Sequence, residues 1–371
     1  MTSDLSYMLR ALDLAQRGGR AVMPNPMVGA VVVHNDHVIG EGYHQQFGGP
    51  HAEVHAIRAV HSNDLLQNST LYVTLEPCSH FGKTPPCADL IIDSGIPRVV
   101  VGCRDPFPEV AGRGIAKLRS AGIEVVEDVG RDPCLVLNRR FIIAHRFQRP
   151  YIILKWAETS DGFIAPASRM PTWISSDHSK QMVHRWRAQE MAIMVGTTTA
   201  IVDDPRLTVR STELCDASCM PITNPIRVTI DRTGSLPPTL NIFNTEAPTI
   251  VFTLQQREQH DTVTYAQLRE DAVVLPQLCA SLHQRGILSL IVEGGQRTLQ
   301  SFLDAGLWDE ARIFHCRKTF GSGIAAPRMT SPPHTQIDSG GDILYHYAHP
   351  DLPTRLDVSY SASEVLSTLT L

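Results

Sequence analysis

Three residues in the first quarter of the chain, His51, Cys78 and Cys87, are of the types that bind zinc, and Glu53 lies two positions after the histidine. Zinc takes nitrogen and sulfur ligands in a tetrahedron, and a catalytic site leaves one corner for water. Three protein ligands therefore suit a catalytic site. A zinc ion there would lower the pKa of water from ~15.7 to about 7. Glu53 would take the proton and pass it to a leaving amine, so the pattern predicts hydrolytic deamination of a base.

The spacing of the cysteines departs from the general deaminase signature, in which about two residues separate them. Eight residues intervene here, and the last two, 85–86, are prolines that favour a helix starting at Cys87. The dipole of that helix would favour a thiolate. Two alternatives are a structural zinc site with His80 or His55 as fourth ligand, and buried cysteines without a metal. Glu53 argues against both, because neither requires it.

Two longer motifs resemble the bifunctional riboflavin-biosynthesis deaminase/reductase family. Residues 51–56 read His-Ala-Glu-Val-His-Ala, and residues 74–87 read Thr-Leu-Glu-Pro-Cys-Ser-His-Phe-Gly-Lys-Thr-Pro-Pro-Cys. The long cysteine spacing is that family's own version. The resemblance implies a cytidine-deaminase-like three-layer α/β/α domain with one zinc ion per chain. It also implies that residues 24–29 line a pyrimidine pocket with Asn25 as a substrate contact, although Asn25 between prolines also suits a turn.

Length and composition indicate the number of domains, the cellular compartment and the kinds of partner. At 371 residues with 43% hydrophobic and 19% charged residues, the chain suits two globular domains. A net charge of −5 argues against a broad nucleic-acid footprint. Eight cysteines without a repeating framework favour a reducing compartment. No signal peptide and no apolar run near ~20 residues are apparent. We therefore expect a cytoplasmic homo-oligomer that binds a small molecule and neither nucleic acid nor a membrane.

The first half alternates strand-like and helix-like segments. Strands are predicted at residues 30–33, 38–43, 70–75 and 98–101, and helices at 51–60, 87–94 and 131–145. This alternation predicts a sheet that contains parallel strands and has helices on its faces. Ligands in such sheets bind at the carboxyl ends of strands and at helix N-termini. The polar stretch 146–150 is the expected boundary, with a deaminase domain at 1–147 and a second domain at 150–371.

Two glycine-containing segments of the second half are candidates for binding a dinucleotide. Residues 321–326 imitate the glycine-rich fingerprint, but Pro327 follows where a helix should extend, so we reject this segment. In residues 288–299 an apolar strand ends in Glu-Gly-Gly and a helix begins. Two glycines would let backbone N–H groups approach a pyrophosphate. An ordinary strand-to-helix turn explains this segment equally well.

Further segments resemble the reductase half of the same family, which is similar in fold to dihydrofolate reductase and uses NADPH: residues 155–162, 173–174, 185–188, 197–210, 292–295 and 318–321. The resemblance implies substrate positions at Lys155, Arg187, Leu207, Arg210 and Glu293. It implies cofactor positions at Glu158, Trp173, Thr199, Asp203, Gly295, Gln296, Arg297 and Thr298. Glu158 stands where many relatives have a small residue. Without the resemblance, the arginines would be read as surface cations.

Two further expectations concern phosphate groups. Arg187 and Arg210 are of the type that forks onto a phosphate, and we expect one of them to hold the 5′-phosphate of the substrate. Arg232, just after the predicted strand 227–231, is the candidate for the 2′-phosphate of NADPH, and an exposed turn cation is the alternative.

The sequence therefore predicts an α/β protein with a deaminase domain and a reductase domain. The first domain would deaminate a diamino-pyrimidinone ribosylamine phosphate with zinc, and the second would reduce the ribose of the product to ribitol with NADPH. One rival is a nucleotide or tRNA-base deaminase with an attached binding domain, against which residues 155–162 and 203–205 speak. The other is a zinc-stabilised ligand-binding protein, against which Glu53 speaks.

Overall fold

The computed structural model describes residues 4–79, 85–106, 111–170, 172–210, 223–260 and 262–358. They divide into two units, one of residues 4–147 with 353–358 and the other of residues 148–352. His80, considered above as a zinc ligand, lies outside the described residues. In the described part of the chain, none of the helices has both the length and the apolar character needed to cross a membrane.

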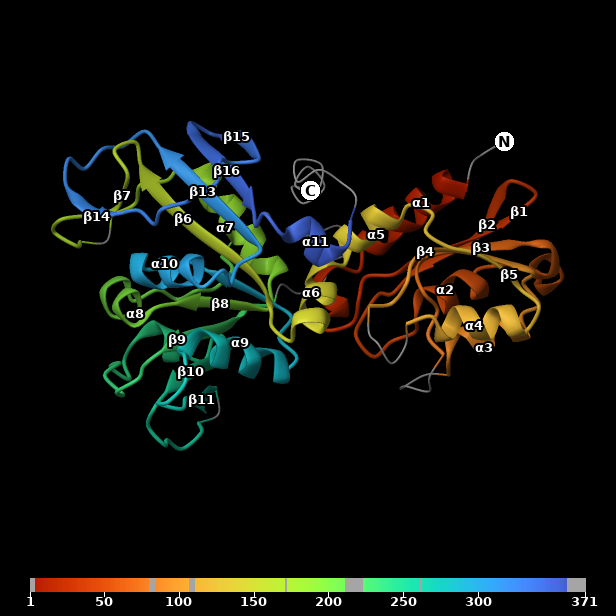
Figure 1. Ribbon diagram of the computed structural model, residues 1–371, viewed down its shortest axis with the longest axis horizontal. Helices are drawn as coiled ribbons and strands as arrows, with labels where there is room; N and C mark the ends of the chain where they lie inside the picture. Colours follow the sequence, from red (N-terminus) through yellow and green to blue (C-terminus); the bar gives the residue numbers. More distant parts are fainter. Residues whose placement is uncertain are drawn as a thin grey trace. The chain divides into compact units, whose positions relative to one another are not determined.

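The first unit is built on a five-stranded sheet in the order β2-β1-β3-β4-β5 (Figure 1). The strands are β1 (Gly29–His34), β2 (His37–Tyr43), β3 (Thr70–Leu75), β4 (Arg98–Cys103) and β5 (Glu124–Val126). Strand β1 is antiparallel to both β2 and β3, whereas β3, β4 and β5 run parallel. The carboxyl ends of β3 and β4 therefore meet at one edge, and the loop with Cys78 leaves from that edge.

Helices cover both faces of this sheet, as Figure 1 shows. They are α1 (Asp4–Gln16), α2 (Ala52–Arg58), α3 (Cys87–Asp93), α4 (Arg113–Ser120), α5 (Arg131–Leu137) and α6 (Arg139–Phe147), with 3-10 turns η1 (Gly19–Val22) and η2 (Asn63–Asn68). Helices α2, α3 and α4 share one apolar cluster with alternate residues of β1, β3 and β4. Helix α1 lies on the opposite face, where a Cβ on Gly29 would be 1.9 Å from the carbonyl oxygen of Ala11. The three-layer α/β/α architecture is confirmed.

One predicted helix is wrong in its extent. Residues 131–145 form two helices, α5 and α6, separated at Asn138. The Asn138 side chain accepts a hydrogen bond from the Met27 N–H (2.8 Å) and donates one to the Met27 carbonyl (2.9 Å). This pairing ties the junction of the two helices to the segment before β1, and nothing local in the sequence indicates it.

The second unit contains a nine-stranded sheet in the order β11-β10-β9-β8-β12-β6-β13-β16-β15. The strands are β6 (Tyr151–Thr159), β8 (Ala192–Val195), β9 (Ile226–Ile230), β10 (Thr249–Thr253), β11 (Val263–Gln267), β12 (Ser289–Val292), β13 (Glu310–Cys316), β15 (Thr335–Ser339) and β16 (Asp342–Ala348). The strands from β11 to β13 in this order are parallel, and β16 and β15 complete the sheet antiparallel. Strand β12 lies between β8 and β6, so the direction of strand addition changes there, and ligands bind in the crevice at such points.

The helices of this unit are α7 (Asp177–Gln189), α8 (Thr197–Asp203), α9 (Val274–Gln284) and α10 (Gln296–Asp304), with the 3-10 turn η4 (Asn241–Phe243). Helix α11 (Leu352–Leu356) follows β16 in the sequence and, from residue 353 on, belongs to the first unit. Helices α9 and α10 pack in the apolar core with Leu154, Met194 and Phe252. On the other face, Trp186 of α7 stacks on Phe314 of β13, with ring centres 5.5 Å apart. The rejected segment forms strand β14 (Gly323–Ala325), paired with β7 (Phe163–Pro166), and not a helix start.

Candidate active sites

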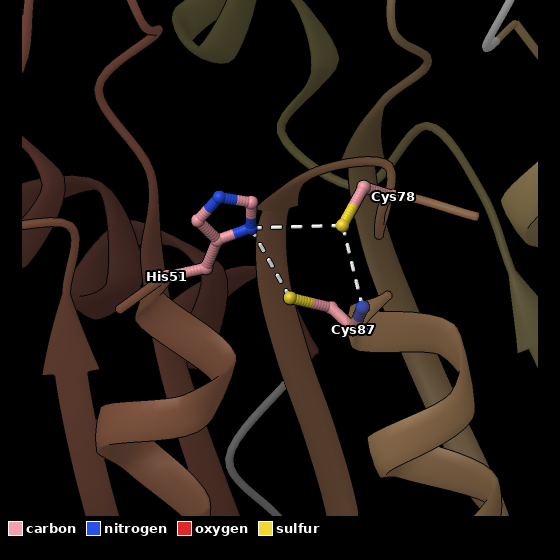
Figure 2. A group of neighbouring side chains, drawn as sticks. All are labelled: His51, Cys78 and Cys87. Carbon is pink, nitrogen blue, oxygen red and sulfur yellow. Dashed lines mark hydrogen bonds between the residues drawn. The ribbon is translucent and has the colours of Figure 1, made fainter. Parts of the chain in front are cut away.

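The three predicted zinc ligands converge at the carboxyl edge of the first sheet. His51 is the residue preceding α2, Cys87 is the first residue of α3, and Cys78 lies in the loop after β3. Figure 2 shows the three side chains facing a common point; His51 Nδ1 lies 3.6 Å from Cys78 Sγ and 3.3 Å from Cys87 Sγ. The Cys87 N–H donates to Cys78 Sγ (3.3 Å) and the Ala88 N–H to the Cys78 carbonyl (3.1 Å), which docks the loop on α3.

These distances fit zinc. Bonds of ~2.3 Å to sulfur and ~2.0–2.1 Å to nitrogen, at a tetrahedral angle, place nitrogen and sulfur ligands about 3.5 Å apart. Among the described residues, His51, Cys78 and Cys87 are the only group of histidine, cysteine and acidic side chains placed to share a metal ion. His55 is outside that group, so it does not complete a structural four-ligand site.

Glu53, in the first turn of α2, has the environment of a proton-transferring group. It is 3% exposed. Burial, and after it the neighbouring Cys78, raise the pKa of Glu53 to about 6, while His51 opposes the shift. A carboxyl group with a pKa near the working pH exchanges protons efficiently in both directions. Hydrogen bonds with Cys87 and His51 lower the pKa of the Cys78 thiol, which favours the thiolate that a metal requires.

Asn25 is linked to the metal ligand His51 by a buried histidine, His44. His44 is buried, its ring packs edge-on against that of His51 with centres 5.4 Å apart, and its Nδ1 lies 2.9 Å from the Pro50 carbonyl. Because a carbonyl only accepts, His44 Nδ1 carries the proton, and Nε2 accepts from Asn25 Nδ2 at 3.2 Å. This fixes the amide so that the side-chain oxygen of Asn25 is left to accept a further hydrogen bond.

In the second unit, the loops after β8 and β12 meet at short distance. A Cβ on Gly196 would lie 2.2 Å from Thr298 Oγ1, and a Cβ on Gly295 would lie 2.7 Å from Thr199 Oγ1. The Gly196 N–H donates to the Gly294 carbonyl (2.9 Å). The N-termini of α8 and α10 therefore lie side by side, with first-turn N–H groups that their helices leave unbonded. This cradle, with Gln296 and Arg297 in the first turn of α10, fits the pyrophosphate of a dinucleotide.

Glu293, the residue before this cradle, pairs with Arg187 of α7. Arg187 Nε and Nη2 each lie 2.7 Å from one Glu293 oxygen, and Nη1 donates to the Thr208 carbonyl at 3.2 Å. The two side chains are 12% and 7% exposed. Burial alone would raise the pKa of Glu293, but Arg187 and then Lys155 lower it to about 2. Lys155 of β6 lies on the same sheet face, and burial lowers its pKa against the opposing effect of Glu293.

The segment from Asp203 to Arg210 is fixed at both ends. Asp204 accepts hydrogen bonds from the backbone N–H and the side-chain amide of Asn241, both at 2.7 Å. At the other end, the Arg210 N–H donates to His184 Nδ1 at 3.3 Å. Between them, Leu207 is buried with a positive φ of 54°. The predicted substrate residues Leu207 and Arg210 are thus held near Arg187, while the side chain of Arg210 is exposed.

Comparison with known proteins matches the two halves of the chain to two different protein families. Residues 1–103 match the cytidine and deoxycytidylate deaminase zinc-binding region, and residues 150–338 match the RibD C-terminal domain. The riboflavin biosynthesis protein RibD of Aquifex aeolicus is 42% identical over 333 residues, which cover 87% of this chain and 89% of that protein. The chain belongs to the RibD family. RibD of Escherichia coli K12 is 41% identical over 331 residues, covering 86% of this chain and 89% of that protein.

Solved RibD structures have the same fold over nearly the whole chain. Acinetobacter baumannii RibD superposes with a TM-score of 0.84 at 36% identity, over 93% of this chain and 98% of that one. The diaminohydroxyphosphoribosylaminopyrimidine deaminase/5-amino-6-(5-phosphoribosylamino)uracil reductase of Thermotoga maritima does so with a TM-score of 0.81 at 38% identity, with the same coverage. The predicted family and the two-domain α/β fold class are confirmed.

Three of the residues predicted to contact the cofactor make none of the cradle contacts described above. Trp173 is 67% exposed, with Lys180 Nζ 4.8 Å from its ring centre. Glu158 accepts from Trp156 Nε1 and contacts His315 Nε2, both at 2.7 Å. Arg232 is exposed after β9, the strand next to β8, so it follows the same carboxyl edge as the cradle.

His184 is a further residue of the candidate reductase site that was not predicted from the sequence. Burial, and after it Arg187 and Arg210, lower the pKa of His184 to about 4, so the ring is neutral at pH 7. A signal was available: His184 lies three residues before Arg187, which places both on one face of α7. The structure also buries His44 beside His51.

Proposed function

We propose that this chain is a bifunctional enzyme of riboflavin biosynthesis that catalyses two consecutive steps. The first is hydrolytic deamination of 2,5-diamino-6-(5-phosphoribosylamino)pyrimidin-4(3H)-one. The second is reduction of the ribose of 5-amino-6-(5-phosphoribosylamino)uracil to ribitol. The observation that carries the proposal is the convergence of His51, Cys78 and Cys87 beside buried Glu53, in a chain that aligns with the Aquifex aeolicus RibD protein over 87% of its length.

In the deaminase site, each residue has a stated task. His51, Cys78 and Cys87 would hold zinc, which when bound lowers the pKa of water to about 7. Glu53 accepts a proton from the attacking water and delivers it to the departing 2-amino group, so that ammonia leaves. Asn25, fixed by His44, offers its side-chain oxygen to a donor group of the pyrimidine.

In the reductase site, the cradle of Gly196, Gly295 and the first turns of α8 and α10 would bind NADPH, which supplies the hydride. Glu293 and Lys155, which lie beside it on the α7 face, suit the ribose hydroxyls. Arg187 is occupied by Glu293, whereas the guanidinium of Arg210 pairs with no acidic side chain in the described part of the chain, so we assign the 5′-phosphate to Arg210. Thr199, Asp203, Gln296, Arg297 and Thr298 would contact the cofactor, with Glu158, Trp173 and Arg232 as more distant contributors.

We assign the deaminase to residues 1–147 and the reductase to residues 150–371. We also propose a cytoplasmic homo-oligomer that acts on this small molecule and binds neither nucleic acid nor membrane. The net charge of −5 supports the exclusion of nucleic acid. Sedimentation analysis of the purified chain tests the oligomeric state.

Turnover of the diamino substrate with NADPH, with ammonia and the ribityl product measured separately, tests both activities. We expect ammonia release to require zinc, and NADPH oxidation to follow only when the deaminated compound is present. Zinc-loaded protein that releases no ammonia would contradict the first assignment. Failure to oxidise NADPH with the deaminated substrate would contradict the second.

A further inference from the structure

The carboxylate of Glu76, at the start of the metal-binding loop, gathers an unusual number of backbone donors. It is 4% exposed. Its Oε2 accepts from the N–H groups of Gly112 (2.9 Å) and Asp105 (3.3 Å). Its Oε1 accepts from those of Gly114 (2.9 Å) and Ile115 (3.3 Å). Both oxygens are therefore occupied by the loop after β4 and the first turn of α4.

The backbone around Glu76 is held equally closely. The Glu76 N–H donates to the Cys103 carbonyl at 2.9 Å, which ties it to the end of β4. A Cβ on Gly114 would lie only 1.9 Å from the Pro77 carbonyl oxygen, so α4 packs directly on the loop and a methyl group there would shift the loop away from α4. The chain just before Cys78 is thus fixed by β4 on one side and by α4 on the other.

This anchoring bears on the metal site because Cys78 is two residues further on. Its sulfur must lie within a few tenths of an ångström of a ligand position, and residues that orient metal ligands contribute strongly to affinity. We propose that Glu76 is a positioning residue for zinc: its four backbone hydrogen bonds hold Cys78 where His51 and Cys87 converge. This rests on the proposed zinc-dependent deaminase function.

The chemistry of the contact requires a carboxylate. Glu76→Gln preserves the length of the side chain but leaves one oxygen and one NH₂ group. An NH₂ group cannot accept, so two of the four N–H donors would face another donor. Gly114→Ala perturbs the same contact from the side of α4 and leaves Glu76 intact. A residue that only capped α4 would change stability but would not change the ligand geometry of the folded protein.

The test measures zinc affinity by competition with a chromophoric chelator, and ligand geometry by the visible absorption of the cobalt-substituted protein. Glu127→Gln is the matched control, because Glu127 pairs with Arg104 and with Arg119 of α4, away from the metal loop. We expect Glu76→Gln to raise the zinc dissociation constant about 10–100-fold and to alter the cobalt spectrum. Gly114→Ala should change both in the same direction, and Glu127→Gln should change neither.

The possible outcomes distinguish failure of the proposed deaminase function from failure of the positioning role of Glu76. Circular dichroism and thermal unfolding report whether the first unit of each variant is folded, because reductase activity would report only on the second unit. Wild-type protein that binds no zinc would overturn the proposed deaminase function. Wild-type binding with equal affinity and spectrum in Glu76→Gln would overturn the positioning role alone. If Glu76→Gln does not fold, Gly114→Ala decides, and unchanged zinc affinity in that variant would reject the proposal.

Discussion

Arg187 and Arg210 should give opposite results when each is replaced by alanine, because only Arg187 has a buried partner. The Arg187→Ala change leaves the Glu293 carboxylate buried without its two charge-assisted hydrogen bonds. The Arg210→Ala change removes an exposed guanidinium, and the backbone N–H that contacts His184 remains. The first variant should therefore lose stability, and the second should lose affinity for the substrate phosphate.

The magnitudes follow from burial. Removing one partner of a buried ion pair costs ~3–5 kcal/mol. For a domain of about 200 residues this corresponds to a melting temperature lower by roughly 6–20 °C. A charge-assisted hydrogen bond to a phosphate contributes ~1.5–3 kcal/mol, or roughly 10–150-fold in affinity. Arg210→Ala should therefore bind phosphorylated substrate that much more weakly and barely distinguish it from the dephosphorylated compound.

Two assays separate these effects. Thermal unfolding reports stability, and KM values for phosphorylated and dephosphorylated substrates, followed by NADPH oxidation, report phosphate recognition. Arg206→Ala is the control, since Arg206 makes only an exposed pair with Glu246 among the described residues and should retain both properties. An Arg187→Ala protein that is as stable as the wild type and has lost phosphate discrimination would refute the reasoning.

Three further predictions concern the reductase unit. The folded pKa of Glu293, about 2, is below its ordinary 4.5, so the stability it adds is present above pH 4.5 and is lost as pH falls towards 2. Urea unfolding from pH 5 to 3 should show a progressive loss of unfolding free energy, on the order of 3 kcal/mol when complete, and the Glu293→Gln variant should lack this loss. The same pH dependence of stability in the wild type and the variant would contradict the prediction. Arg232→Ala should bind NADPH about tenfold more weakly with NADH binding unchanged, and equal loss for both would show that Arg232 does not contact the 2′-phosphate. Asn241→Asp, which sets two carboxylates together, should raise the substrate KM of reduction, and adding Asp204→Asn should restore it; no rescue would mean the pair does not position the segment.

The zinc triad could be predicted from sequence because its chemistry is local. Each ligand stands in a short motif whose residue types, His-x-Glu and Pro-Cys, carry the mechanism, and strand–loop–helix patterns place both motifs at one sheet edge. The helix that begins at Cys87 could also be predicted from the sequence, since two prolines mark its start. Local patterns therefore fixed the deaminase half closely.

The reductase half depends on contacts between residues far apart in the sequence, which periodicity does not report. Arg187 and Glu293 are separated by 106 positions, and only the fold shows that they neutralise each other. At the junction of α5 and α6, the side chain of Asn138 pairs with Met27, 111 positions away. The proposed role of Glu76 likewise depends on backbone N–H groups up to 39 residues later in the chain. The local motif contains Glu76 but does not indicate what its carboxylate binds.

The most direct test of the two-module account is Glu53→Gln, assayed for both outputs. The substitution keeps the side-chain size and leaves His51, Cys78 and Cys87 in place. Zinc should remain bound at one ion per chain, while ammonia release falls at least ~10²-fold because the proton-transferring carboxylate is gone. The same protein, given deaminated substrate and NADPH, should oxidise the cofactor at nearly the wild-type rate. Unchanged ammonia release, or simultaneous loss of both activities in a folded protein, would contradict the account.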